Sequence, residues 1–140
     1  MAEYSQQAFS ITTNGRGLYE IGQRINDCLT DSAIITGLVH VFLQHTSASL
    51  IISENADPTV LSDLETVISR LAPDGDPEYR HNYEGDDDMA AHIRSVLTTN
   101  DLTIPISNGR MALGTWQGVF LWEHRYRPHQ RKLLLTISGN

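Results

Sequence analysis

The segment LTIPISNGRMALGTWQGVFLWEHR, Leu102–Arg125, carries the pattern that decides the fold. Two short apolar runs, Leu102–Ile106 and Met111–Leu113, flank Asn108-Gly109, the residue pair that tight β-hairpin turns favour. A third run, Val119–Arg125, follows without an intervening helical pattern. Strands that follow one another through short turns usually pair as antiparallel hairpins. The segment therefore predicts an antiparallel sheet rather than parallel strands that alternate with helices.

The rest of the chain adds strands and helices around this segment. Apolar alternation or clustering predicts four more strands, at Tyr4–Thr12, Leu38–His45, Leu50–Ile52 and Lys132–Ile137. Apolar residues at helical spacing predict three helices: one that begins at Gly17, one from Pro58 to just before Pro73, and one over Asp88–Leu97. The expected order is β-α-β-β-α-α-β-β-β-β, which is an α+β fold with a largely antiparallel sheet. No linker divides residues 1–140, so we expect a single domain.

Composition limits the classes of function. Seventeen acidic residues against ten basic ones give a net charge of −7, which disfavours nucleic-acid binding and a polybasic membrane anchor. The single cysteine, Cys28, cannot form an internal disulfide, which suits a reducing compartment. Met1–Ser10 has neither the basic nor the apolar part of a signal peptide. We therefore expect a cytoplasmic protein with no nucleic-acid or membrane partner.

The first polar segment lies between two apolar strands. It comprises His45-Thr46-Ser47-Ala48-Ser49, followed by Glu54-Asn55-Ala56-Asp57. Hydroxyl groups and backbone amides in such a turn could bind an anionic group such as phosphate. The alternative is an ordinary turn at a strand end, with Asp57 capping the next helix.

The second polar segment runs from His81 to His92. Asp88 and His92 are four residues apart and share a helix face, and His81 and Glu84 approach the same corner. Imidazole and carboxylate groups can bind a metal or exchange protons near neutral pH. The spacing matches no standard zinc signature, and acidic residues at a helix N-terminus are also explained by the helix dipole. Both interpretations stay open.

The third polar segment lies at the end of the Val119–Arg125 strand. Strand alternation places Glu123 and Arg125 on the face of Val119 and Leu121. If that face points inward, two opposite charges are partly buried and must pair or meet a ligand. If it points outward, they form a surface pair. Periodicity alone does not decide between the two.

Three runs resemble the YjbQ-like family, whose members are often labelled secondary thiamine-phosphate synthases. They are HTSASLIISENADPTVLSDLE (His45–Glu65), HNYEGDDDMAAHI (His81–Ile93) and NGRMALGTWQGVFLWEHR (Asn108–Arg125). The resemblance covers nearly the whole chain, and it implies a β-sandwich-like core and a homotrimer. It also implies a transferase that joins hydroxymethylpyrimidine pyrophosphate to thiazole phosphate, with "secondary" marking this as a possible side activity. The ligand would then be a phosphorylated small molecule.

The resemblance also places functional residues on this chain. The expected catalytic residues are His45, Glu84, Asp88, His92, Glu123 and Arg125. The expected substrate-binding residues are Ser47, Ser49, Asn55, Thr115, Trp116 and Gln117. His45, His81 and His92 each lie in one of these runs and would converge if the 81–92 loop folds over the end of the 38–45 strand. They could then hold a divalent metal, Mg²⁺ or Zn²⁺, or bind phosphate and move protons without a metal. We assign His40, His124 and His129 to structural roles.

Two other classes of function compete with the enzyme. No nucleophile–base pair is identifiable from spacing, so the chain could be a noncatalytic protein that binds a phosphorylated metabolite or a metal. The polar segments could instead form an interface in a structural oligomer.

Overall fold

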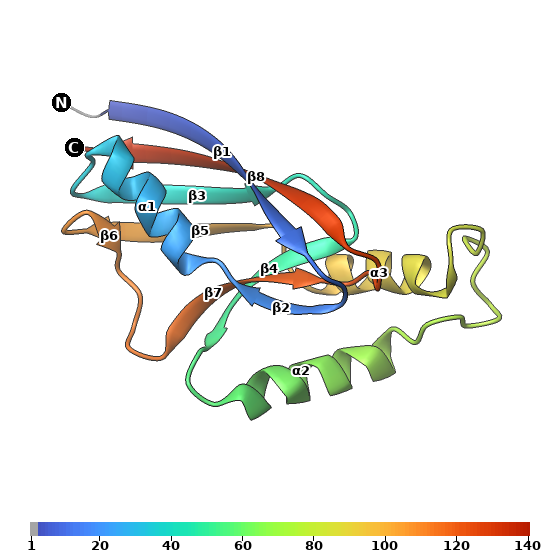
Figure 1. Ribbon diagram of the computed structural model, residues 1–140. Helices are drawn as coiled ribbons and strands as arrows, with labels where there is room; N and C mark the ends of the chain where they lie inside the picture. The colour runs from blue at the N-terminus through green and yellow to red at the C-terminus, as the bar shows by residue number, and fades with distance from the viewer. Residues whose placement is uncertain (1–2) are drawn as a thin grey trace.

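The computed structural model describes residues 3–140 and contains eight strands and three helices (Figure 1). The strands are β1 (Glu3–Thr13), β2 (Gly17–Glu20), β3 (Gly37–Leu43), β4 (Ala48–Glu54), β5 (Asp101–Ser107), β6 (Arg110–Met111), β7 (Gln117–Glu123) and β8 (His129–Gly139). The helices are α1 (Gly22–Ser32), α2 (Pro58–Leu71) and α3 (Asp86–Leu97).

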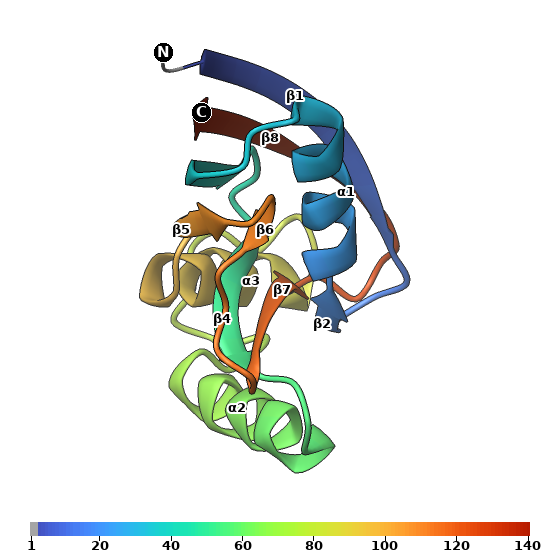
Figure 2. The same cartoon turned by 90° about the vertical axis from the view of Figure 1, so that its left-hand side faces the viewer.

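The strands form two sheets in which every paired strand is antiparallel. The larger sheet has the order β1-β8-β3-β5-β6, and the smaller has the order β2-β7-β4. Figures 1 and 2 show α1 packed beside the sheets, with α2 beyond the smaller sheet. The predicted α+β class, with a largely antiparallel sheet and three helices, is confirmed.

The core lies between the inward faces of the sheets and α1. Alternation along β3 buries Val39, Val41 and Leu43, and α1 contributes Ile25 and Leu29. β7 differs, because the side chains of both its faces are buried from Gly118 to Glu123. The question of whether Glu123 lies inward is therefore settled: its exposed fraction is 0%.

The predicted start of the first helix is wrong. Gly17–Glu20 is strand β2, which pairs with β7, and α1 begins only at Gly22. Leu18 fits the helical spacing of Ile21 and Ile25 by coincidence, because its own contacts are made across the strand pair with Trp122. A partner more than a hundred residues away decides the structure here, which local periodicity does not detect.

Two local predictions are confirmed. Asp57 caps α2 by accepting a hydrogen bond from the backbone N–H of Thr59 at 2.9 Å, and Pro58 opens the helix. Asn108 and Gly109 have φ of 53° and 76°, the left-handed conformation that a tight hairpin turn requires. Within residues 3–140, no helix is long and apolar enough to cross a membrane. Location in the cytoplasm stays a prediction.

The first and last strands lie side by side. β1 pairs with β8 along its whole length, from Glu3 opposite Gly139 to Thr13 opposite His129. On its other edge β8 pairs with β3. The last strand in the sequence is thus an inner strand of the larger sheet (Figure 1).

Candidate functional site

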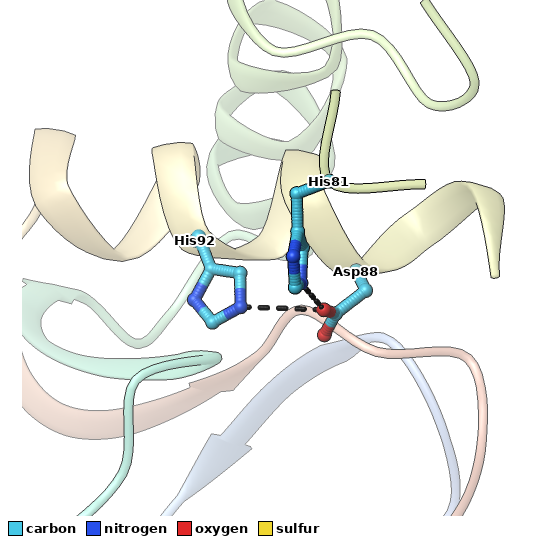
Figure 3. A group of neighbouring side chains, drawn as sticks. All are labelled: His81, Asp88 and His92. Atoms are coloured by element: carbon cyan, nitrogen blue, oxygen red, sulfur yellow. Dashed lines mark hydrogen bonds and ion pairs between the residues drawn. The ribbon is translucent and has the colours of Figure 1, made fainter. Parts of the chain in front are cut away.

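The first turns of α3 and the loop before it bring two imidazoles to one carboxylate (Figure 3). His81 Nε2 lies 2.6 Å from Asp88 Oδ2, and His92 Nε2 lies 3.3 Å from the same oxygen. The three possible ligand atoms lie within 4.8 Å of one another. Glu84 adds a second carboxylate, with Oε2 3.6 Å from His81 Nε2. We call His81, Glu84, Asp88 and His92 the α3 cluster.

Local structure explains why these residues meet. Asp88 and His92 are one helical turn apart on α3, so both project from the same face. His81 arrives from the loop between α2 and α3. That loop is fixed near its start, where Gly75 N–H donates to Asp86 O at 2.9 Å. At its end Glu84 O accepts a hydrogen bond from Arg125 Nη2 at 2.9 Å.

Groups outside the α3 cluster orient its members. His92 Nδ1 lies 3.2 Å from Thr46 O, an oxygen that can only accept, so Nδ1 carries a proton and Nε2 points toward Asp88. Arg125 Nη1 donates to Asp88 Oδ1 at 2.6 Å and leaves Oδ2 facing the imidazoles. Metal-binding histidines and carboxylates are commonly held in this way by a carbonyl or a charged partner.

The α3 cluster favours a cation. The side chain of Asp88 is only 3% exposed. Burial alone would raise the pKa of Asp88, but the hydrogen bond with His81 and the charge of Arg125 hold that pKa below its usual value. Four carboxylates lie in or beside the cluster and two guanidinium groups contact three of them, so these six side chains together carry two net negative charges. These charged residues are Glu84, Asp87, Asp88, Glu123, Arg125 and Arg131.

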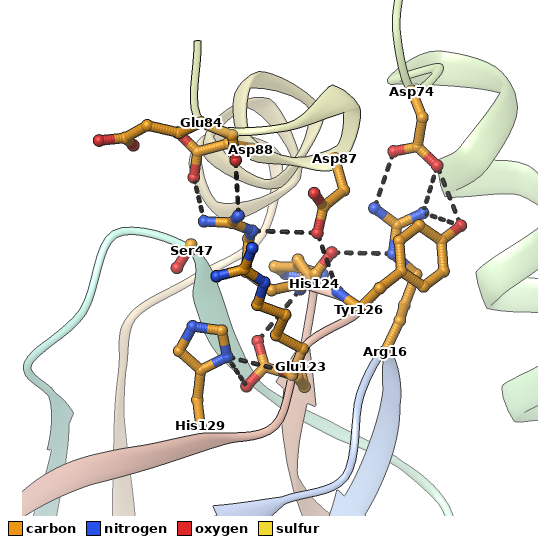
Figure 4. Close-up of polar contacts among 12 residues, drawn as sticks. Arg16, Ser47, Asp74, Glu84, Asp87, Asp88, Glu123, His124, Tyr126 and His129 are labelled. Atoms are coloured by element: carbon orange, nitrogen blue, oxygen red, sulfur yellow. Dashed lines mark hydrogen bonds and ion pairs between the residues drawn. The ribbon is translucent and has the colours of Figure 1, made fainter. Parts of the chain in front are cut away.

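A second polar group, which sequence reasoning missed in part, lies below the first (Figure 4). Glu123 is paired with Arg131, whose Nε donates to Glu123 Oε1 at 2.7 Å. Burial would raise the pKa of Glu123, but the hydrogen bonds from Arg131 and Thr13 keep it low. Arg131 Nη2 also donates to Ser47 Oγ at 3.0 Å. Arg131 could have been found, because it has the same strand parity as the buried Leu133.

A third group buries the expected substrate-binding residue Ser49. His124 Nδ1 accepts a hydrogen bond from Arg94 Nε at 2.9 Å, so the proton of its neutral ring is on Nε2. Nε2 then donates to Ser49 Oγ at 2.8 Å. Burial, followed by the charge of Arg94, lowers the pKa of His124 to about 2. A histidine that donates to a buried serine cannot act as its base, so this pair is not an activated nucleophile.

His45 lies outside the α3 cluster. Its Nε2 accepts a hydrogen bond from the backbone N–H of Lys132 at 2.8 Å, and its Nδ1 faces Arg131 Nη1 at 3.3 Å. Burial and the charge of Arg131 lower the pKa of His45, which keeps the ring neutral. With its accepting nitrogen already used by the backbone, His45 lies in a cavity wall beside His92.

The other expected substrate-binding residues gather at the opposite end of the smaller sheet. The β4–β7 register places Ala48 opposite Glu123, and Glu54 opposite Gln117. At about 3.3 Å per strand residue, the two ends are about 20 Å apart. One chain therefore does not bring these residues to the α3 cluster. They are Asn55, Thr115, Trp116 and Gln117.

Comparisons with known proteins identify relatives along nearly the whole chain. The family model described as "UPF0047 protein YjbQ-like" matches residues 7–140. A UPF0047 protein of Synechocystis is 54% identical over 134 residues, which cover 96% of this chain and 91% of the relative. The UPF0047 protein YjbQ of Escherichia coli O157:H7 is 41% identical over 135 residues, covering 96% and 97%. A crystal structure from Sulfolobus solfataricus has a TM-score of 0.85 at 21% identity, covering 99% and 100%, which supports the fold alone.

These findings correct the predicted reaction. Neither relative is named as a thiamine-phosphate synthase, and the Sulfolobus protein is described as a YbjQ-like protein of unknown function. The prediction of a transferase that makes thiamine phosphate is therefore wrong. The family resemblance itself is confirmed by the match over residues 7–140.

Proposed function

The chain belongs to the YjbQ-like UPF0047 family, and we propose that it is a metal-dependent protein that holds a divalent transition-metal ion at the α3 cluster. The observation that carries the proposal is the convergence of two imidazole nitrogens on one carboxylate oxygen, with all three atoms within 4.8 Å. His81, Asp88 and His92 are the three proposed ligands, and Glu84 lies beside His81 as a second, more exposed carboxylate.

The donor set favours a zinc-like ion over magnesium. Imidazole nitrogen suits Zn²⁺ and other late transition metals, whereas Mg²⁺ prefers oxygen ligands and bound water. The two net negative charges around the α3 cluster match one divalent cation. Zinc binds nitrogen and oxygen at about 2.0–2.1 Å, so two ligand atoms of a tetrahedral zinc lie about 3.3 Å apart. His92 Nε2 and Asp88 Oδ2 already have this spacing, whereas His81 Nε2, 2.6 Å from Asp88 Oδ2, must move away from that oxygen.

The site supports metal-assisted chemistry rather than a serine nucleophile. A zinc ion with three protein ligands keeps a position for water and lowers the pKa of that water toward neutrality. The imidazoles of His81 and His92 are both about one-third exposed, so solvent and small molecules reach this edge. Glu84, with a carboxylate 56% exposed beside His81, would be the residue to accept a proton from a water that such an ion held.

Metal titration of matched histidine variants tests the proposal. Isothermal titration calorimetry with Zn²⁺ should give one ion per wild-type chain, and His92→Ala and Asp88→Asn should each weaken binding by at least tenfold. His40→Ala is the matched control, because His40 also pairs with an aspartate, Asp101, at 2.9 Å but lies on the exposed side of β3. Equal zinc affinity in His92→Ala and His40→Ala would show that the α3 cluster is not the site.

We also propose that the chain forms a homotrimer, as the family resemblance implies. Support comes from the distance of about 20 Å along the sheet that separates Asn55, Thr115, Trp116 and Gln117 from the end at Glu123. A second copy would be needed to bring these polar residues into one site with the α3 cluster. Sedimentation equilibrium should give three times the 15.6 kDa mass of one chain. A mass of 15.6 kDa at micromolar concentration would contradict this assembly.

A further inference from the structure

A cavity of about 440 Å³ opens beside the α3 cluster. Its volume lies in the range of small-molecule sites. His92 belongs both to the cluster and to the cavity wall, so a molecule in the cavity would lie next to an ion held by His92. The lining residues are His45, Thr46, His92, Ser95, Val96, Thr98, Thr99 and Asn100.

Three of the four hydroxyl groups that line the cavity, those of Ser95, Thr98 and Thr99, present acceptors to it. Ser95 Oγ donates its hydrogen to Ala48 O at 3.2 Å. Thr98 Oγ1 donates to Arg94 O at 2.7 Å, and Thr99 Oγ1 donates to Asp101 O at 3.0 Å. Each hydroxyl has one hydrogen and two lone pairs, so a hydroxyl whose hydrogen is used can only accept from a ligand.

The charges around the cavity wall also favour a ligand that donates hydrogen bonds over a phosphate group. α3 ends at Leu97, and the last carbonyls of a helix carry partial negative charge. Among the described residues that line the cavity there is no lysine or arginine. His45 is neutral, because burial and the charge of Arg131 lower its pKa. A phosphate group would find little positive charge here, apart from an ion at the α3 cluster.

We propose that this cavity binds the substrate of the metal centre, and that the substrate carries an amine or amide group that donates hydrogen bonds to the wall. The claim that the ligand is a substrate rests on the proposed metal function. The claim that it donates hydrogen bonds rests on the residues of the cavity wall. A phosphorylated ligand, which the sequence led us to expect, is the competing outcome of the test.

The experiment compares probes with the same carbon chain. Butylamine, butyramide and butyl phosphate are titrated into the full-length protein with and without Zn²⁺. Binding is followed by the backbone amide NMR shifts of Thr98, Thr99 and Asn100. Butylamine and butyramide should shift these resonances in a saturable way and bind more tightly than butyl phosphate. Tighter binding of butyl phosphate in the absence of Zn²⁺, or no saturable shift with any probe, would overturn the inference.

Two variants at Val96 test the charge preference. Val96 lines the cavity, is 84% exposed and lies in the last turn of α3, where a charged side chain is tolerated. Val96→Lys should weaken butylamine binding about three- to tenfold through like-charge repulsion. Val96→Glu should not weaken it. Equal effects of the two variants on butylamine would refute the donor preference.

The same titrations separate the two proposals. Zinc affinity should be unchanged in Val96→Lys, because Val96 is not a ligand. If zinc fails to bind while butylamine still prefers the cavity, the metal function is wrong and the donor preference stands. If zinc binds and butyl phosphate is preferred without it, the metal function stands and the donor preference is wrong.

Discussion

Replacing Arg131 with methionine should destabilise the protein strongly. Arg131 and Glu123 are both almost fully buried, and the guanidinium contacts both carboxylate oxygens. In Arg131→Met, Glu123 keeps the hydroxyl of Thr13 at 2.7 Å, the backbone N–H of Arg125 at 3.1 Å and the more distant His129 Nδ1 at 3.8 Å. These contacts do not replace a guanidinium that binds both carboxylate oxygens in a buried site. Ser47 also loses its link to β8.

The size of the loss follows from this geometry. Removing one partner of a buried ion pair typically costs about 3–5 kcal/mol, because the other charge stays buried without compensation. Domains are stable by only about 5–15 kcal/mol in total. The variant should therefore be marginally folded at room temperature. Its unfolding free energy is measured by urea denaturation at pH 7, followed by circular dichroism.

Two further variants make the measurement decisive. Glu123→Gln combined with Arg131→Met removes the unpaired charge but keeps an acceptor for Thr13, so it should recover about half of the loss. Arg110→Met is the control, because Arg110 is exposed on β6 and should change stability by less than about 0.5 kcal/mol. The reasoning fails if Arg131→Met costs under about 1 kcal/mol, or if the double variant is no more stable than the single one.

Three more results are expected. Hydrogen bonds outweigh burial and hold the folded-state pKa values of Glu65 and Glu123 below normal, so their stabilisation is present above about pH 4 and is lost as the pH falls. Glu65→Gln should therefore weaken the dependence of unfolding free energy on acid pH, and an unchanged dependence would contradict this. Zn²⁺ should slow tryptic cleavage after the exposed Arg80, because His81 is the next residue, and His81→Ala should abolish the protection without changing cleavage elsewhere. Ser49→Ala should cost about 1–3 kcal/mol of unfolding free energy, since the buried N–H of His124 loses its acceptor, and it should leave zinc affinity unchanged. A large loss of zinc affinity would show that Ser49 belongs to the site.

Local signals in the sequence were sufficient for some elements and not for others. Asp57-Pro58 and Asn108-Gly109 act through bonds to their nearest neighbours, so their structures could be predicted. Gly17–Glu20 could not, because its strand exists only through pairing with β7. Secondary structure that depends on a distant partner leaves a weak local pattern.

The candidate site shows the same division. Asp88 and His92 share a helix face by spacing alone, and their side chains lie together in the structure. Arg94 and Arg131 were missed, because a buried arginine depends on a carboxylate elsewhere in the chain, here Glu65 and Glu123. Spacing within a helix predicts neighbours on one face, but it does not predict which charges will be buried across elements.

The pairing of β8 between β1 and β3 has a consequence for biosynthesis. Until β8 has been made, β1 has no partner in the larger sheet, and the edge of β3 that β8 will cover is open. Native contacts that join distant segments slow folding, and unpaired strand edges promote aggregation. The larger sheet can therefore be completed only after translation of its last strand, and the emerging chain is a candidate for chaperone binding until that moment.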